Sequence, residues 1–256
     1  MILCSPTPIS IIKAAMLAEI HNDLPCLKGD QESLGLFMFT SELDADNTTL
    51  PVLIEKLNNT CGLNANWLLS NPGKILTQLI SANLRYQSND KTAVIFAAIE
   101  QAIRYGHVFC FTGAGDISKL FRDRSKAVSH EIHRMLGFVR FRPAANNTLI
   151  AQPKLFHNTA DIILRRFALR YPNTRLVIVL DDQALVLDNN ILSLVPSAEF
   201  SPYLLASDTF SKTWETYYQA QYLATRKNIH LAERAIPKKY WSWLNEGQYS
   251  QKESSS

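Results

Sequence analysis

The chain has 256 residues, of which 46% are hydrophobic and 19% charged, a composition that excludes wholesale disorder and fits one large domain or two smaller ones. The net charge of +3 hides an uneven distribution. Residues 1–100 hold 6 Lys or Arg against 10 Asp or Glu, whereas residues 101–256 hold 20 against 13. A basic half of this kind favours a polyanionic partner.

Neither a membrane span nor a secretion signal is evident in the sequence. No window reaches the roughly 18 apolar residues that would cross a bilayer, and the first residues lack a basic segment followed by an apolar one. We therefore expect a soluble, cytoplasmic protein without membrane contact. The cysteines are widely spaced and form no CxxC pair, so we expect reduced thiols rather than a zinc site. They are Cys4, Cys26, Cys61 and Cys110.

Helical periodicity dominates the first part of the chain, and we predict a mostly helical N-terminal region over residues 1–112. The expected helices cover residues 9–22, 50–59, 66–69, 73–84 and 91–105. A short apolar run over residues 107–111 is then broken by Gly113 and Gly115.

The second part predicts an α+β domain over residues 113–248, followed by a disordered tail over residues 249–256. A long helix begins at Asp116, as its N-cap, and runs to about Met135. Strands are expected at residues 138–142, 148–152, 175–180 and 184–187, and helices at 158–171 and 207–225, with an irregular stretch over 188–206. The fold class is therefore α+β, with a small antiparallel C-terminal sheet and packed helices.

The segment around residue 140 is the strongest candidate for nucleic-acid contact. If it is a strand, Phe138, Arg140 and Arg142 share one face, which would offer a ring for base stacking and two guanidinium groups for phosphate. Basic and aromatic residues also gather further along the chain. The complete predicted interface comprises Arg134, Phe138, Arg140, Arg142, Arg226, Lys227, Asn228, Lys238, Lys239, Tyr240 and Trp241.

Catalytic and metal-binding patterns are weak. His130 and His133 lie three residues apart with Glu131 between them, but this is not a zinc-protease motif, and we interpret the pair as incidental. Asp181 and Asp182 follow a strand and are typical of a hairpin turn. No cofactor-binding motif stands out, so neither a cofactor nor a metal is predicted.

Four segments, in the same order, resemble a bacterial family of unknown function that carries the description DNA metabolism protein. They are His133 to Phe141, Phe167 to Asp181, Trp214 to Asn228, and Ile236 to Trp241. The resemblance covers about residues 115–246. It implies a role with DNA, because members are typically encoded beside a radical S-adenosylmethionine protein assigned to DNA modification or repair, and some are fused to a uracil-DNA-glycosylase-like domain.

We therefore expect a DNA-binding accessory protein in DNA repair or modification, with DNA and a radical S-adenosylmethionine protein as partners. Two other interpretations stay open at this point. The protein could act directly on DNA as a glycosylase- or nuclease-like enzyme, with Asp181 or a histidine as acid–base group. Alternatively, it could be a protein–protein adaptor that does not contact nucleic acid.

Overall fold

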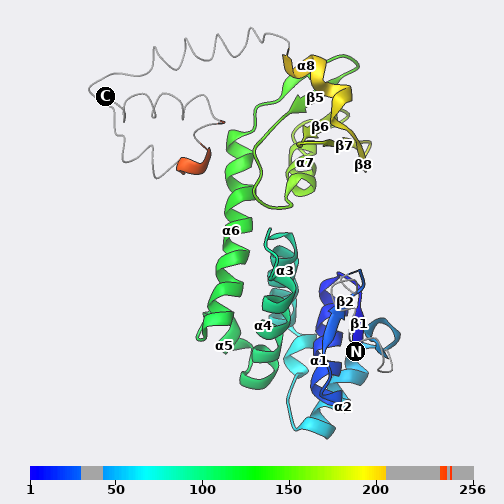
Figure 1. Cartoon of the computed structure of the whole chain (residues 1–256), viewed down its shortest axis with the longest axis vertical. Helices are drawn as coiled ribbons and strands as arrows, with labels where there is room; N and C mark the ends of the chain where they lie inside the picture. The colour runs from blue at the N-terminus through cyan, green and yellow to red at the C-terminus, as the bar shows by residue number, and fades with distance from the viewer. Residues whose placement is uncertain (30–42, 206–236, 241–242, 244–256) are drawn as a thin grey trace, which may run out of the picture. The chain divides into compact units, whose positions relative to one another are not determined.

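A computed structural model describes residues 1–29, 43–205, 237–240 and 243 (Figure 1). It divides into two compact units, Met1–His130 and Glu131–Ser256, whereas the sequence placed a boundary after residue 112. The division falls inside helix α6 (Asp116–Phe138). Within the described ranges, no helix is long and apolar enough to cross a membrane.

The first unit is mostly helical, as predicted, but its N-terminus also forms a small parallel sheet. The strands are β1 (Ile2–Cys4), β2 (Pro25–Leu27) and β3 (Leu43–Asp44), in the order β2-β1-β3. Helix α1 (Pro8–His21) connects β1 to its parallel neighbour β2. Strands of two or three residues are too short to show an alternating pattern, which is why the sequence did not predict them.

The remaining helices of this unit are α2 (Leu50–Cys61), α3 (Asn71–Arg85), α4 (Lys91–Tyr105) and α5 (His107–Thr112), with 3-10 turns at Ala45–Asn47 and Asn66–Leu69. Three of these helices, α2, α3 and α4, agree closely with predicted ranges, whereas α5 was expected only as a short apolar run. Their apolar faces meet α1 and β1 in one core, to which Met16, Leu57, Ile80 and Ile99 contribute fully buried side chains. All four cysteines are free, and burial raises the thiol pKa of Cys4 to about 12.

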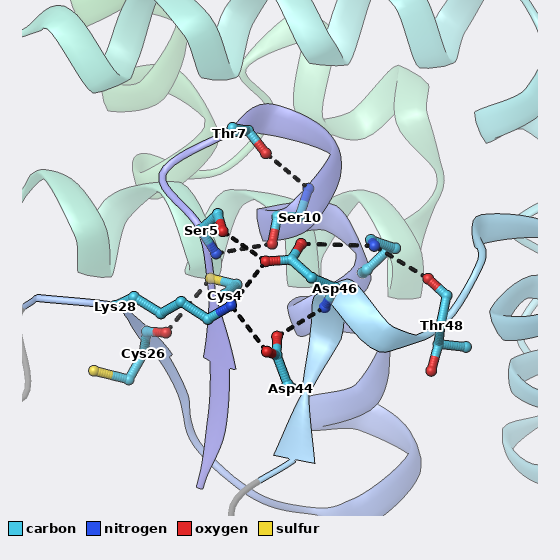
Figure 2. A network of polar contacts seen from close by, with 10 residues as sticks. Cys4, Ser5, Thr7, Ser10, Cys26, Lys28, Asp44, Asp46 and Thr48 are labelled. Atoms are coloured by element: carbon cyan, nitrogen blue, oxygen red, sulfur yellow. Dashed lines mark hydrogen bonds and ion pairs between the residues drawn. The ribbon is translucent and has the colours of Figure 1, made fainter.

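A polar network ties together the carboxyl ends of the three parallel strands (Figure 2). The Lys28 ammonium lies 2.9 Å from an oxygen of Asp44 and 3.0 Å from one of Asp46. The Ser5 hydroxyl donates to Asp46 at 2.6 Å, and the ammonium of the buried Lys13 lies 3.7 Å from the same carboxylate. Two carboxylates therefore face two ammonium groups, and the network is neutral.

These contacts lower the pKa values of both aspartates. Hydrogen bonds from the hydroxyls of Ser10 and Ser5 are the main reason that the pKa of Asp46 is well below its usual range. The backbone N–H of Asp46, followed by Lys28, lowers the pKa of Asp44. A carboxylate whose pKa is lower in the folded chain stabilises the fold above its unfolded pKa, near about 3.9, and loses that effect as the pH falls.

We therefore predict that the melting temperature falls steeply below about pH 4, and that Asp46→Asn makes this fall shallower because one titrating carboxylate is gone. Thermal unfolding by circular dichroism between pH 7 and pH 2 measures both curves. Asp123→Asn, at an exposed position on α6, is the matched control and should keep the wild-type slope. Parallel curves for wild type and Asp46→Asn would contradict the stabilising role of the network.

The second unit is built on a five-stranded sheet in the order β4-β5-β6-β7-β8. The strands are β4 (Arg142–Ala144), β5 (Thr148–Ala151), β6 (Arg175–Val179), β7 (Gln183–Asp188) and β8 (Ile191–Pro196). The pairing is antiparallel except between β5 and β6, which are parallel. This confirms the predicted α+β class with a mainly antiparallel sheet.

Both faces of this sheet are covered. Helix α7 (Ala160–Ala168) packs Ile163, Leu164 and Phe167 against Leu176 and Ile178 of β6 (Figure 1). On the opposite face, Val177 and Val179 of the same strand meet Phe200 from the 3-10 turn Ser197–Phe200, which precedes α8 (Ser201–Leu205). The last described element is a 3-10 turn, Lys238–Tyr240.

The predicted strand at residues 138–142 is wrong. Helix α6 continues to Phe138, residues 139–141 are irregular, and β4 begins only at Arg142. The buried positions of α6 continue at helical spacing as far as Met135, and the backbone N–H of Val139 still bonds to the Met135 carbonyl. Phe138, Arg140 and Arg142 therefore do not share the face of one strand.

The predicted irregular stretch at 188–206 is also wrong, because β8 pairs with β7 along its whole length. A two-residue turn joins them, in which Asn189 and Asn190 adopt φ angles of 46° and 65°. Asparagine tolerates this left-handed region, so the Asn-Asn pair between two apolar runs was the overlooked hairpin signal. The expected helix at 207–225 and the tail at 249–256 lie outside the described residues.

Candidate nucleic-acid interface

Seven of the eleven predicted interface residues are described, and all seven lie in the second unit. Arg226, Lys227, Asn228 and Trp241 lie outside the described residues. Arg134, Phe138 and Lys239 lie around the ring of Tyr240. Arg140 and Arg142 flank Phe141, which contacts the ring of Phe167.

Tyr240 is the centre of the first group, and it is fully buried. The rings of Phe138 and Phe156 meet it edge-on, with centroids at 6.2 and 5.3 Å. Its hydroxyl donates to an oxygen of Glu131 at 3.5 Å. Burial and the Glu131 charge raise the pKa of Tyr240 to about 12, while the Arg134 guanidinium acts in the opposite direction. Tyr240 therefore anchors the segment 237–240, and its ring is not open to a base.

Glu131 holds this region together, and the sequence did not identify it. Its side chain is 1% exposed and accepts hydrogen bonds from the backbone N–H of Phe156 at 2.8 Å and of His157 at 3.1 Å. The Thr159 hydroxyl donates to it at 2.8 Å. A buried carboxylate is tolerated only with such donors. The sequence did hold one indication of a buried carboxylate: Glu131 lies on the apolar stripe of α6, one turn before the buried Met135.

Two lysines surround the exposed side of this group. The ammonium of Lys239 lies 4.2 Å from the ring centroid of Phe156 and 5.0 Å from that of Tyr240, and the Lys154 ammonium lies 5.7 Å from Phe156. Partial burial lowers the pKa of Lys239 and also that of the neighbouring His157. We call Glu131, Phe138, Phe156, Lys239 and Tyr240 the Tyr240 cluster.

The second group centres on Phe167, which is 4% exposed. Phe141 meets its ring edge-on at 4.9 Å, and Tyr171 stacks at 6.4 Å with an interplanar angle of 17°. The Arg170 guanidinium lies 5.6 Å from the same ring. We call these four residues the Phe167 cluster. Phe141 lies between Arg140 and Arg142 in the chain, so the cluster brings the end of α7 to the predicted basic segment.

The two arginines of that segment differ in their surroundings. Arg140 is exposed, and its guanidinium donates to the Gly137 carbonyl at 2.6 Å, which caps the end of α6. Arg142 is half-buried at the start of β4, opposite Ile150 of β5. Lys238 is exposed beside Lys239.

Charge is separated along the described part of the second unit. Residues 132–180 contain eight Lys or Arg and one acidic residue, Asp161. Residues 181–205 contain four acidic residues and no Lys or Arg. The cations thus belong to the end of α6, to β4 and α7 and to the start of β6, and the carboxylates to the turns and strands of β7 and β8. Among the described residues, none of Arg134, Lys154, Arg165, Arg166, Arg170, Arg175 and Lys239 forms an ion pair with a carboxylate.

The residues considered for catalysis do not form a constellation. Asp181 is exposed in the turn after β6, where its carbonyl accepts a hydrogen bond from the Ser197 hydroxyl. His130 and His133 are both exposed on α6. No group of three metal-binding side chains comes together in the part of the chain that the structure describes.

The fold and these clusters define an α+β protein whose second unit carries Lys and Arg side chains next to buried and half-buried aromatic rings. The sequence profile of a domain of unknown function, DUF4130, matches residues 89–246, which is more than half of the chain, and the protein therefore belongs to this family. The match includes α4, α5 and α6 as well as both clusters. No curated protein matches the chain.

Proposed function

We propose that the second unit binds DNA through its cationic side and that the protein serves as an accessory factor in DNA repair or modification. The observation that carries this proposal is the charge separation, with eight Lys or Arg over residues 132–180 and only acidic charges over residues 181–205. A concentration of cations attracts phosphate, and the acidic stretch that follows it in the chain affects the orientation of approach.

The aromatic neighbours of these cations support the same conclusion. Lys239 lies over Phe156, and Arg170 lies over Phe167. An aromatic ring holds a cation through its electron-rich face without neutralising it, so the charge stays available to a phosphate. Positive groups next to rings are also typical of surfaces that bind nucleic acid.

The proposal predicts that Arg170→Ala and Lys239→Ala each weaken binding to a labelled duplex and reduce the slope of log affinity against log salt by about one. Fluorescence anisotropy at several salt concentrations measures both quantities. Lys56→Ala, at an exposed lysine of the first unit, is the matched control and should bind as wild type does. If neither variant differs from wild type, or if Lys56→Ala loses as much, the cationic side of the second unit is not the interface.

The partnership with a radical S-adenosylmethionine protein rests on the resemblance carried by the four segments, all of which lie within the residues 89–246 that the family match covers. Copurification from native cells after DNase treatment tests it. The expected result is an iron–sulfur protein with a radical S-adenosylmethionine sequence in the bound fraction. Its absence, with DNA binding intact, would leave a DNA-binding protein without this partner.

A further inference from the structure

The most exposed large hydrophobic side chain of the described residues is Leu169, which is 85% exposed at the end of α7. A single exposed leucine needs no explanation by itself. Leu169, however, continues the helical backbone with φ −65° and ψ −26°, and so it extends the outer face of α7. On that face it lies one turn after the exposed Arg165 and Arg166 and directly before the exposed Arg170.

The turn that presents Leu169 is firmly held. The backbone N–H groups of Arg170 and Tyr171 both donate to the Phe167 carbonyl, at 2.8 and 3.0 Å. Phe167 itself is buried between Phe141 and the sheet. An exposed apolar side chain on a fixed turn can enter a neighbouring structure without first being ordered, which lowers the entropy cost of binding.

The next residues are also attached to the sheet. The side-chain amide of Asn147, in the turn between β4 and β5, donates to the Asn173 carbonyl at 2.9 Å. The backbone N–H of Arg175 donates to the Asn147 carbonyl at 3.2 Å. The segment from Leu169 to Arg175 is thus connected at both ends to buried structure.

The positive charge around Leu169 indicates which kind of ligand this turn would bind. Arg165 and Arg166 lie one turn before Leu169 on the same helical face, and Arg170 follows directly with its guanidinium over the Phe167 ring. The one carboxylate of α7, Asp161, lies in its first turn. Tyr171, which is 43% exposed, follows directly and is stacked on Phe167. An apolar tip flanked by cations and an aromatic ring matches a nucleic-acid duplex, in which apolar base stacks lie between two rows of phosphates.

We propose that the end of α7 is a wedge that inserts Leu169 between two stacked base pairs of duplex DNA. Arg166 and Arg170 contact the phosphates beside the opened step, and the Tyr171 ring covers the exposed base. This inference rests on the proposed function and deepens it, because it specifies duplex DNA that is locally unstacked. A step weakened by a mismatch or a damaged base is the easiest to open, so such sites are the preferred substrates.

A duplex with 2-aminopurine at one position tests the wedge, because the fluorescence of this base rises when it is unstacked. Wild-type protein should raise the signal, and more so opposite a mismatch. Leu169→Ala should lose most of the rise and bind the mismatched duplex at least several times more weakly, with the salt slope unchanged. Leu169 is exposed, so the variant should keep the wild-type melting temperature.

Ile191→Ala is the matched control, since Ile191 is a 70% exposed apolar residue on β8, an edge strand of the five-stranded sheet in the same unit. It should behave as wild type in every assay. If Leu169→Ala gives the full fluorescence rise while wild type binds with a steep salt slope, the wedge is wrong and the proposed function stands. If the wild-type protein does not bind the duplex at all, the proposed function is wrong, and the wedge is wrong with it. Loss of a copurifying protein in Leu169→Ala, with the fluorescence rise intact, would assign the turn to a protein partner and overturn the wedge.

Discussion

Replacing Glu131 by alanine is expected to destabilise the second unit by about 3–5 kcal/mol. The substitution leaves two partly buried backbone N–H groups without an acceptor, and the Thr159 hydroxyl keeps only the His157 carbonyl at 3.4 Å. Each buried group left without a partner costs roughly 1–3 kcal/mol. Urea unfolding followed by far-ultraviolet circular dichroism measures the loss. A transition in two steps, with the second unit unfolding first, is the expected form.

Two further variants distinguish this explanation from a general sensitivity to substitution. Glu131→Gln keeps the shape but turns an amide N–H₂ toward a donor, so it should lose an intermediate amount of stability. Glu199→Ala, at an exposed carboxylate in the same unit, should change the free energy of unfolding by less than about 0.5 kcal/mol. A near-wild-type curve for Glu131→Ala would contradict the anchoring role of the buried carboxylate.

Replacing Phe167 by alanine is expected to cost about 3–5 kcal/mol, as is usual for large buried aromatic side chains. Its ring packs against Phe141 and Tyr171, and its carbonyl holds the turn that carries Leu169. Phe167→Leu keeps most of the volume and should lose much less, about 1.5 kcal/mol or below. Equilibrium unfolding of the two variants gives the comparison.

Phe167→Leu also separates packing from binding. The variant should stay folded, with a melting temperature close to that of the wild type. Arg170 and Tyr171 lose the ring beside them, so the affinity of the variant for duplex DNA should still fall measurably. If Phe167→Leu binds DNA as wild type does, the aromatic ring has no part in placing these two residues. If Phe167→Ala melts at the wild-type temperature, Phe167 is not the core residue that the packing indicates.

Long elements with a clear period could be predicted from the sequence, and short ones could not. Helix α4 has the predicted bounds because its apolar residues recur at helical spacing over 15 residues. The strands β1 and β3 have three and two residues, which is too short for any period to show. At Phe138, alternating side chains predicted a strand, but the buried stripe of α6 already continued to Met135, and the helix extends past the expected end.

The sequence predicted which types of residue form the candidate site, but it did not predict how they are arranged or which of them are buried. Arg134, Lys239 and Tyr240 were predicted from basic and aromatic composition, and the structure brings Arg134 and Lys239 next to Tyr240. Composition did not distinguish the buried Tyr240 from the exposed Lys239, because exposure depends on what packs across the fold. Glu131 and Leu169 were missed for the same reason: one is a charge that the fold buries, and the other an apolar side chain that it exposes.

The salt dependence of duplex binding by the unmodified protein tests the central claim most directly. At least four phosphate contacts by the cationic side predict that log affinity falls against log salt concentration with a slope of about −3 to −4. The titration requires one labelled duplex and four or five salt concentrations, with anisotropy as the signal. A slope in this range is the predicted result, and an affinity that does not change with salt, or no binding at low salt, would contradict the account.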